Sequence, residues 1–186
     1  MKIEYQKTTQ EDENVIKRQL NAAHVRSMGI VEKCRHGYPR IILLSPMASL
    51  NNEEINYEAI SNVFWLTCPY LNDRIHRIES DGLSVRISDF VHNDLMFRGI
   101  MNRAHAHFYY LRKNLFQDYF KTSLPESKMR VFNTGIGGSR DVNSLKCLHI
   151  QYCHYRVFTE NITGRIISEL LNNVIDCKGV ICKHAG

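Results

Sequence analysis

Any fold of this sequence has to accommodate a long amphipathic stretch in the middle of the chain, over residues 88 to about 120. Its apolar side chains recur mostly at intervals of three and four, which is typical of a helix that packs one face against a core. Ser88 or Asp89 is expected to cap its start, and Gly99 marks an expected break. Because such a helix cannot bury its apolar face alone, the flanking elements must supply the opposing surface.

Strand-length apolar runs precede this stretch, and further helical patterns lie on both sides of it. The expected strands are 29–33, 40–45 and 62–67, with a turn by composition at 34–39. The other expected helices are 9–20, 69 to about 80, about 142–158 and 163–175. This order predicts an α+β fold in which a small three-stranded sheet is covered by four or five helices.

Length and composition indicate an ordinary globular protein. The chain has 186 residues, enough for one domain over 1–175, followed by a loose tail over 176–186. The longest apolar run, 41–44, is far too short to span a bilayer, so no membrane association is expected. Six cysteines without a secretory signal predict reduced thiols and a cytoplasmic location. The net charge of +5 permits an anionic ligand or RNA without requiring either.

The region over residues 133–156 has the composition of a site. Its glycines let backbone N–H groups approach a ligand closely, and a helix that begins soon afterwards directs its positive end towards them. The glycine turn, residues 135–140 (GIGGSR), matches neither the dinucleotide-binding fingerprint nor the P-loop pattern. Two interpretations stay open, an anion-binding turn and a flexible connection. The predicted anion-binding residues are Gly135, Gly137, Gly138, Ser139, Arg140, Lys146 and, from the long helix, Arg112.

Cysteine and histidine side chains predict a metal site at one edge of the sheet. Cys34 and Cys68 follow the first and third strands, so both thiols emerge at one edge if those strands run the same way. Cys147 and His149, at a later helix start, complete a four-ligand set suited to zinc. In the alternative interpretation the cysteines are small buried hydrophobes. Cys68 also precedes a helix, where a lowered pKa would make it a nucleophile with a histidine base.

The long helix carries a polar stripe. His105, Tyr109 and Arg112 share one face at i, i+4 and i+7, and they line an anionic pocket or a solvated surface. Cys177, Cys182 and His184 in the tail are further metal-binding types, but a loose tail argues against a site there.

Four motifs together resemble the family catalogued as domain of unknown function 501. They are 34–39 (CRHGYP), 64–69 (FWLTCP), 135–138 (GIGG) and 146–149 (KCLH), within a resemblance over about 15–170. Phe108 stands where the resemblance leads us to expect a tyrosine, and residues 46–61 depart from the expected proline-containing stretch. The family is mainly bacterial, and the resemblance implies a cytoplasmic protein in which residues of these motifs line one pocket. It implies no particular reaction.

Three functional hypotheses follow. In the first, the protein is a metal- or thiol-dependent enzyme on a small anionic, phosphate-type substrate, with Cys147, His149 and His105 as catalytic residues and the glycine turn as the anion clamp. In the second, it is a non-enzymatic module with structural zinc that binds a protein or RNA partner. In the third, it holds no metal. An open ligand position distinguishes catalytic from structural zinc.

Overall fold

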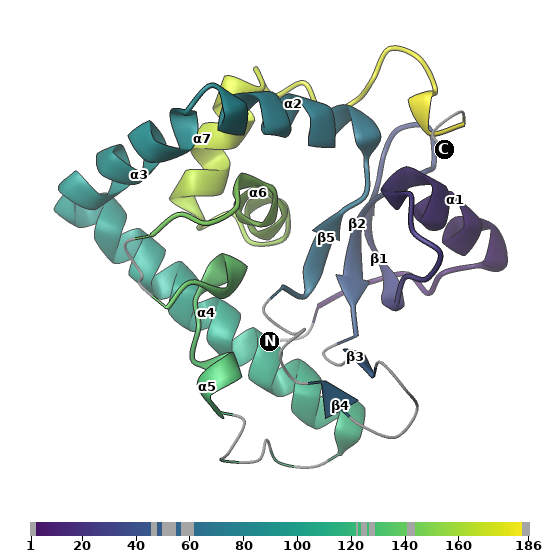
Figure 1. Ribbon diagram of the computed structural model, residues 1–186, viewed down its shortest axis with the longest axis horizontal. Helices are drawn as coiled ribbons and strands as arrows, with labels where there is room; N and C mark the ends of the chain where they lie inside the picture. The colour runs from purple at the N-terminus through teal and green to yellow at the C-terminus, as the bar shows by residue number, and fades with distance from the viewer. Residues whose placement is uncertain are drawn as a thin grey trace.

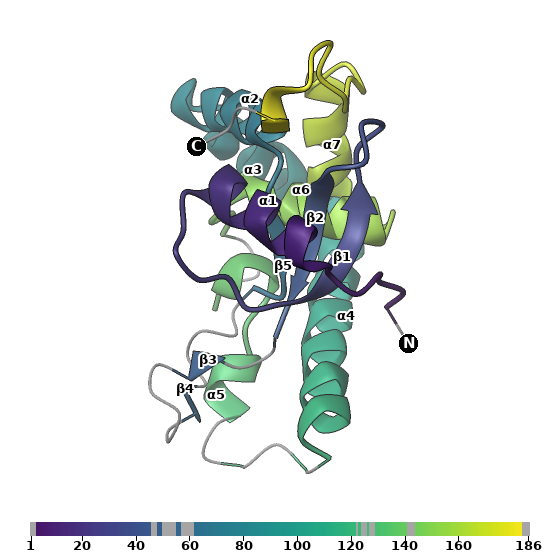
Figure 2. The ribbon, with the colours of Figure 1, turned by 90° about the vertical axis from the view of Figure 1, so that its right-hand side faces the viewer.

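A three-stranded antiparallel sheet lies between one helix on one face and a group of helices on the other (Figures 1 and 2). The computed structural model describes residues 3–45, 48–49, 55–56, 62–121, 123, 126, 129–140 and 144–183. The predicted α+β class is confirmed. Residues 46–61, which depart from the stretch expected from the resemblance, lie outside the described residues, except for the short antiparallel strands β3 (Ala48–Ser49) and β4 (Ile55–Asn56).

The sheet has the order β1-β2-β5, and its strands are β1 (Ser27–Lys33), β2 (Pro39–Leu44) and β5 (Phe64–Leu66). Because β1 and β5 both pair antiparallel with β2, they run the same way. Central β2 is buried on both faces. Its Ile42 packs with Ile16 of helix α1 (Gln10–Leu20), whereas Ile41 and Leu43 belong to the main core. This double burial explains why β2 reads as a continuous apolar run.

The first helix, α1 (Gln10–Leu20), begins where the sequence predicts. The Thr9 hydroxyl accepts a hydrogen bond from the Asp12 N–H (3.1 Å), and the Asp12 carboxylate accepts one from the Thr9 N–H (3.1 Å). This reciprocal pair satisfies two N–H groups that the helix start would otherwise leave free.

The long helical stretch consists of two helices, which corrects the prediction of one. They are α3 (Leu83–Asn93) and α4 (Leu95–Phe120). The break falls at Asp94, whose carboxylate accepts hydrogen bonds from the N–H groups of Met96 (2.8 Å) and Phe97 (2.9 Å). Gly99 lies inside α4. The apolar periodicity continues across the break, so only the capping aspartate marks it.

Two further helix boundaries differ from the prediction. Helix α6 (Leu148–Val157) starts several residues later than 142, and α7 (Ile162–Leu170) ends before 175. Helix α2 (Pro69–Ser80) is as predicted, and α5 (Met129–Phe132) is an additional single turn. Figure 1 shows α6 end-on in the middle of the helical layer. It contacts β5, α2, α7 and the short 3-10 helix η3 (Ile136–Gly138), so the start of α6 is surrounded by protein.

The segment after α7, described as far as residue 183, packs against the sheet and α1. Asp176 forms an ion pair with the buried Arg40 of β2 and accepts a hydrogen bond from the Arg35 N–H (3.1 Å). The 3-10 helix η4 (Ile181–Lys183) contacts α1 and α2, and its Cys182 is buried. Within the described part of the chain, no helix combines the length and apolar character needed to cross a bilayer.

Candidate functional site

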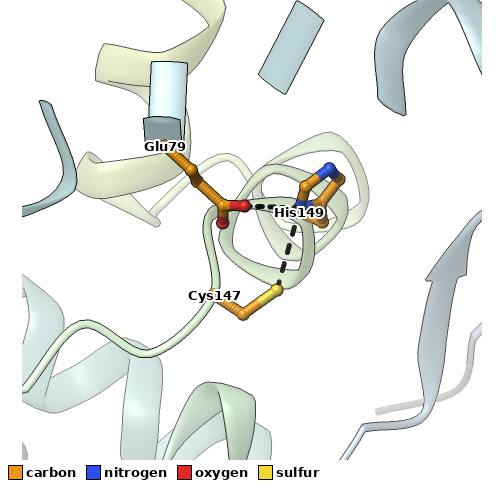
Figure 3. Close-up of side chains that lie close together, drawn as sticks. All are labelled: Glu79, Cys147 and His149. Carbon is orange, nitrogen blue, oxygen red and sulfur yellow. Dashed lines mark hydrogen bonds and ion pairs between the residues drawn. The ribbon is translucent and has the colours of Figure 1, made fainter. Parts of the chain in front are cut away.

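Three potential metal ligands meet at the start of α6 (Figure 3). Glu79 comes from the last turn of α2, Cys147 is the residue that caps α6, and His149 is the second residue of that helix. One ligand atom from each side chain lies within 4.8 Å of the other two. All three residues are partly buried, so the group is held by the protein while remaining open to small molecules.

Backbone groups fix the orientation of two of these side chains. The Leu148 N–H donates to Oε1 of Glu79 (2.7 Å), and the other carboxylate oxygen, Oε2, lies 3.5 Å from Nδ1 of His149. The carbonyl of Asn72 lies 3.3 Å from Nε2 of His149. Because a carbonyl only accepts hydrogen bonds, Nε2 carries a proton, and Nδ1 is directed towards Cys147 and Glu79.

Cys147 is the N-cap residue of α6. The Glu79 carboxylate accepts the first N–H of the helix from outside, at the positive end of the helix dipole. The 3.9 Å between Cys147 Sγ and His149 Nδ1 completes the triangle.

Electrostatics favour charged forms of both α6 residues. Burial raises the pKa of the Cys147 thiol, but the contacts with His149 and the Ile150 N–H outweigh burial, and the net shift is downwards. Burial lowers the pKa of His149, but Cys147 and Glu79 outweigh it, and the net shift is upwards. The site therefore places a thiol with a lowered pKa and a carboxylate around one imidazole.

The positions of the thiol and the carboxylate around the imidazole ring distinguish a catalytic triad from a set of metal ligands. In a nucleophile–histidine–acid triad, the thiol or hydroxyl and the acid face opposite ring nitrogens. Here the thiol and the carboxylate both face Nδ1, and a carbonyl holds Nε2. Three donor atoms that converge on one point, with the other ring N–H on a carbonyl, are the arrangement of metal ligands.

The distances fit a single ion of zinc size. A tetrahedral zinc with Zn–S of about 2.3 Å and Zn–N and Zn–O of about 2.0 Å would separate sulfur from nitrogen by about 3.5 Å and nitrogen from oxygen by about 3.3 Å. The corresponding distances of 3.9 Å and 3.5 Å are wider by a few tenths of an ångström. For these two pairs, a small inward movement of the side chains would give the separations of a zinc site.

The structure brings together two of the four predicted metal ligands, Cys147 and His149. Cys34 lies in the turn after β1, where its N–H donates to the Tyr38 carbonyl (2.9 Å). Cys68 is buried beside Cys182 at the start of α2. Both follow strands that run the same way, as the prediction required, but neither is in the group formed with Glu79.

The glycine turn lies against the start of α6. Gly137 and Gly138 have φ values of 77° and 71°, in the left-handed region that favours glycine. A Cβ on Gly137 would lie 3.4 Å from Ile150 and 3.7 Å from Lys146. Several N–H groups of the turn already have partners within the protein, since Gly135 donates to the Ser139 carbonyl (2.7 Å) and Gly138 to the Gly135 carbonyl (3.0 Å).

Arg112 and His105, predicted to act on a ligand, contact the glycine turn and the residues just before it. The fully buried Arg112 guanidinium donates to the carbonyls of Phe132 (2.8 Å) and Thr134 and to the Thr134 hydroxyl (3.0 Å). Burial lowers its pKa to about 10, although Tyr109 opposes the shift. Nδ1 of the buried His105 accepts a hydrogen bond from the Ile136 N–H (3.0 Å).

The remaining predicted anion-binding side chains are distributed around the turn. Arg140 is exposed, Ser139 is buried with its hydroxyl 2.6 Å from that of Ser144, and exposed Lys146 reaches the Gly138 carbonyl (3.5 Å). An open pocket of about 460 Å³ lies beside the turn. It is lined by Asn102, His105, Ala106, Tyr109, Asn133, Thr134, Gly135, Ser139 and Arg140.

Sequence reasoning missed Glu79 and the carbonyl of Asn72. Both come from α2, far from Cys147 in the sequence, so no local spacing connects them. One signal was available for Glu79, because a carboxylate in the last turn of a helix is disfavoured by the helix dipole unless it has a partner. Here it lies at the start of another helix.

Comparison with known proteins identifies one family. The family described as protein of unknown function (DUF501) matches residues 30–169, which is 140 of the 186 residues. This range contains strands β2 and β5, the glycine turn and the Glu79–Cys147–His149 group. No curated protein and no solved structure matches the chain. The chain therefore belongs to the DUF501 family of proteins of unknown function.

Proposed function

We propose that this protein is a metal-dependent enzyme in which Glu79, Cys147 and His149 hold one zinc ion. The observation that carries the proposal is that the thiol and the carboxylate both face Nδ1 of His149, while the Asn72 carbonyl holds Nε2. Nitrogen, oxygen and sulfur donors together suit zinc, and iron(II) is the other metal that such a set admits.

Three protein ligands leave the fourth position for water. When bound, a zinc ion would activate water for hydrolysis at neutral pH. Glu79 and Cys147 would supply two negative charges to the ion, and the Leu148 N–H holds Oε1 of Glu79 in place. The proposed reaction is therefore hydrolysis, with the protein holding the ion and positioning its water.

The proposed substrate is a small phosphate-type ester. Exposed Lys146 directly precedes Cys147, and exposed Arg140 comes two residues after the last glycine of the turn. Lys146 contacts the turn through the Gly138 carbonyl and is next to the proposed ligand Cys147 in the chain, and Arg140 lines the pocket beside the turn. They would attract an anionic group and stabilise the charge that develops on it during hydrolysis.

A second candidate function is a thiol-dependent enzyme with Cys147 as nucleophile. The lowered pKa of Cys147 at a helix start supports it, because the thiolate is the reactive form. Its weakness is the Glu79 carboxylate, which lies on the thiol side of the imidazole and disfavours the thiolate.

The test is elemental analysis of the untagged protein purified without chelator. We expect about one equivalent of zinc per chain, lost in Cys147→Ser and Glu79→Gln. In the second variant the amide oxygen of the introduced glutamine can still accept the Leu148 N–H, so the loss would report the missing charge. Cys34→Ser is the matched control, and it should retain the metal. Loss in Cys34→Ser as well would instead support the four-ligand set predicted from the sequence.

Activity is then measured on a chromogenic aryl phosphate. Hydrolysis should stop after chelation, return on addition of zinc, and fall at least about 100-fold in Cys147→Ser. Absence of metal together with inactivation by iodoacetamide would favour the thiol enzyme. A full equivalent of zinc without hydrolysis of any phosphate ester tested would point to a structural site.

A further inference from the structure

Two buried thiols from distant parts of the chain meet where the C-terminal segment lies against α1 and α2. Cys68 directly precedes α2, and Cys182 lies in η4. Each is only 3% exposed. Both views of the ribbon show the segment with η4, in yellow, beside α1 and the start of α2 (Figures 1 and 2). Neither thiol belongs to the Glu79–Cys147–His149 group, and the proposed function does not use them.

The contact between them is asymmetric. The Cys182 sulfur accepts a hydrogen bond from Nε2 of Gln19 (3.2 Å) and interacts with the Cys68 thiol. The interaction with Cys68 lowers the pKa of Cys182 to about 6 against the effect of burial, with Gln19 contributing. The same interaction and burial raise the pKa of Cys68. The hydrogen bond from Gln19 favours the thiolate form of Cys182, and burial disfavours that form of Cys68.

The other four cysteines have different surroundings. Cys177 donates its thiol proton to the Gly179 carbonyl, and Cys153 is fully buried in α6. Cys147 faces His149, and Cys34 lies half-buried in the hairpin turn. The surroundings of these four cysteines therefore differ from the thiol–thiol contact between Cys68 and Cys182.

We propose that Cys68 and Cys182 are a redox pair that a hydroperoxide oxidises to a disulfide. The Cys182 thiolate attacks the terminal peroxide oxygen, the O–O bond breaks, and the leaving alkoxide takes a proton to become an alcohol or water. Sulfur is oxidised by two electrons to a sulfenic acid. The Cys68 sulfur then attacks the Cys182 sulfur, loses its proton, and displaces water as the S–S bond forms.

The disulfide would fasten the C-terminal segment to the core. It would close a loop of 115 residues, from 68 to 182 inclusive, which restricts the unfolded chain far more than a short loop would. It would also tie that segment to the start of α2, the helix that carries Asn72 and Glu79. Oxidation would therefore strengthen the attachment of one helix of the candidate metal site.

The test uses the full-length protein, reduced, freed of reductant and titrated with hydrogen peroxide. We expect a loss of two hydrogens in the intact mass and, in a non-reducing tryptic digest, one cross-linked peptide pair that contains Cys68 and Cys182. Dithiothreitol should reverse both changes. The melting temperature of the oxidised form should rise by about 5–10 °C. A digest in which these two thiols stay reduced while others react would overturn the proposal.

Single-cysteine variants show which thiol attacks the peroxide and which thiol then forms the disulfide. Cys68→Ser should stop at the sulfenic acid on Cys182, which dimedone traps, whereas Cys182→Ser should form no cross-link. Cys177→Ser is the matched control from the same segment and should still form the Cys68–Cys182 disulfide. Because the wild-type digest alone identifies the linked peptides, a variant that failed to fold would not leave the proposal untested. Trapping on Cys68 in place of Cys182 would contradict the assigned roles.

Discussion

At the scale of single residues, Arg112 shows how a group that suits a ligand can instead hold the protein's own backbone. Its guanidinium reaches two carbonyls and one hydroxyl in the segment that leads into the glycine turn. It also lies over the ring of Phe108, with its central carbon 4.7 Å from the ring centroid. A planar fork of donors fits this set of acceptors, and a single ammonium group does not.

Replacing Arg112 with lysine should therefore lower the free energy of unfolding by about 2–4 kcal/mol, because buried carbonyls lose their donors. Urea denaturation followed by circular dichroism measures the change. Arg103→Lys, an exposed position on the same helix, should stay within about 0.5 kcal/mol of the wild type. An Arg112→Lys protein as stable as the wild type would show that the guanidinium contacts contribute little.

At the scale of elements, the packing of α7 on α6 depends on one glycine. A Cβ at Gly164 would lie 2.3 Å from the Gln151 carbonyl oxygen and 2.3 Å from Cβ of Tyr155, both in α6. No side chain can occupy that space unless the helices separate. Gly99, inside α4, has only the end of Arg103 nearby, at 3.9 Å.

Substitution of these two glycines by alanine should therefore change the stability of the protein in opposite directions. Gly164→Ala should destabilise the protein by about 2–3 kcal/mol through overpacking. Gly99→Ala should stabilise it by about 0.5–1 kcal/mol, because alanine has the higher helix propensity. Thermal unfolding of both variants checks the pair. Equal effects would mean that α6 and α7 can separate at little cost.

Elements also show how far the sequence predicts the structure. The capping box at Thr9 and the apolar run of β2 are local signals, and both identify their elements correctly. The break at Asp94 depends on one carboxylate within an unbroken apolar pattern, so periodicity conceals it. Cys147 and His149 are adjacent to one helix start and were predictable as partners. Glu79 joins them only because α2 crosses that helix start, which no sequence spacing records.

At the scale of the whole molecule, buried histidines should make the fold sensitive to acid. His154 is fully buried in α6, within ring contact of His107 and Phe108 of α4 and of Phe158. Burial first, and then the nearby His107 and His105, lower its pKa to about 3. Burial also lowers the pKa of His107, although Glu160 opposes that shift. The folded protein therefore binds fewer protons than the unfolded chain at mildly acidic pH.

This difference in proton binding determines how the stability of the fold changes with pH. The stability is unaffected above the unfolded pKa of about 6.5 and falls as the pH decreases from there towards 3, by up to about 1.4 kcal/mol per pH unit. Urea denaturation between pH 7.5 and 4.5, with and without chelator, measures the slope. His154→Phe should flatten it whatever its stability at pH 7.5, whereas exposed His24→Gln should leave it unchanged. An unaltered slope in His154→Phe would assign the acid sensitivity to other groups.

The ion pair between Arg40 and Asp176 has a consequence for synthesis on the ribosome. The two residues are 136 positions apart, so at 5–20 residues per second the arginine is translated roughly 7–27 s before the aspartate. During that interval the last strand of the sheet is translated, and Arg40 can pair with the carboxylate of Glu32. A chain terminated prematurely before position 176 would contain every strand of the sheet and still lack one of the charges that allow its central arginine to be buried.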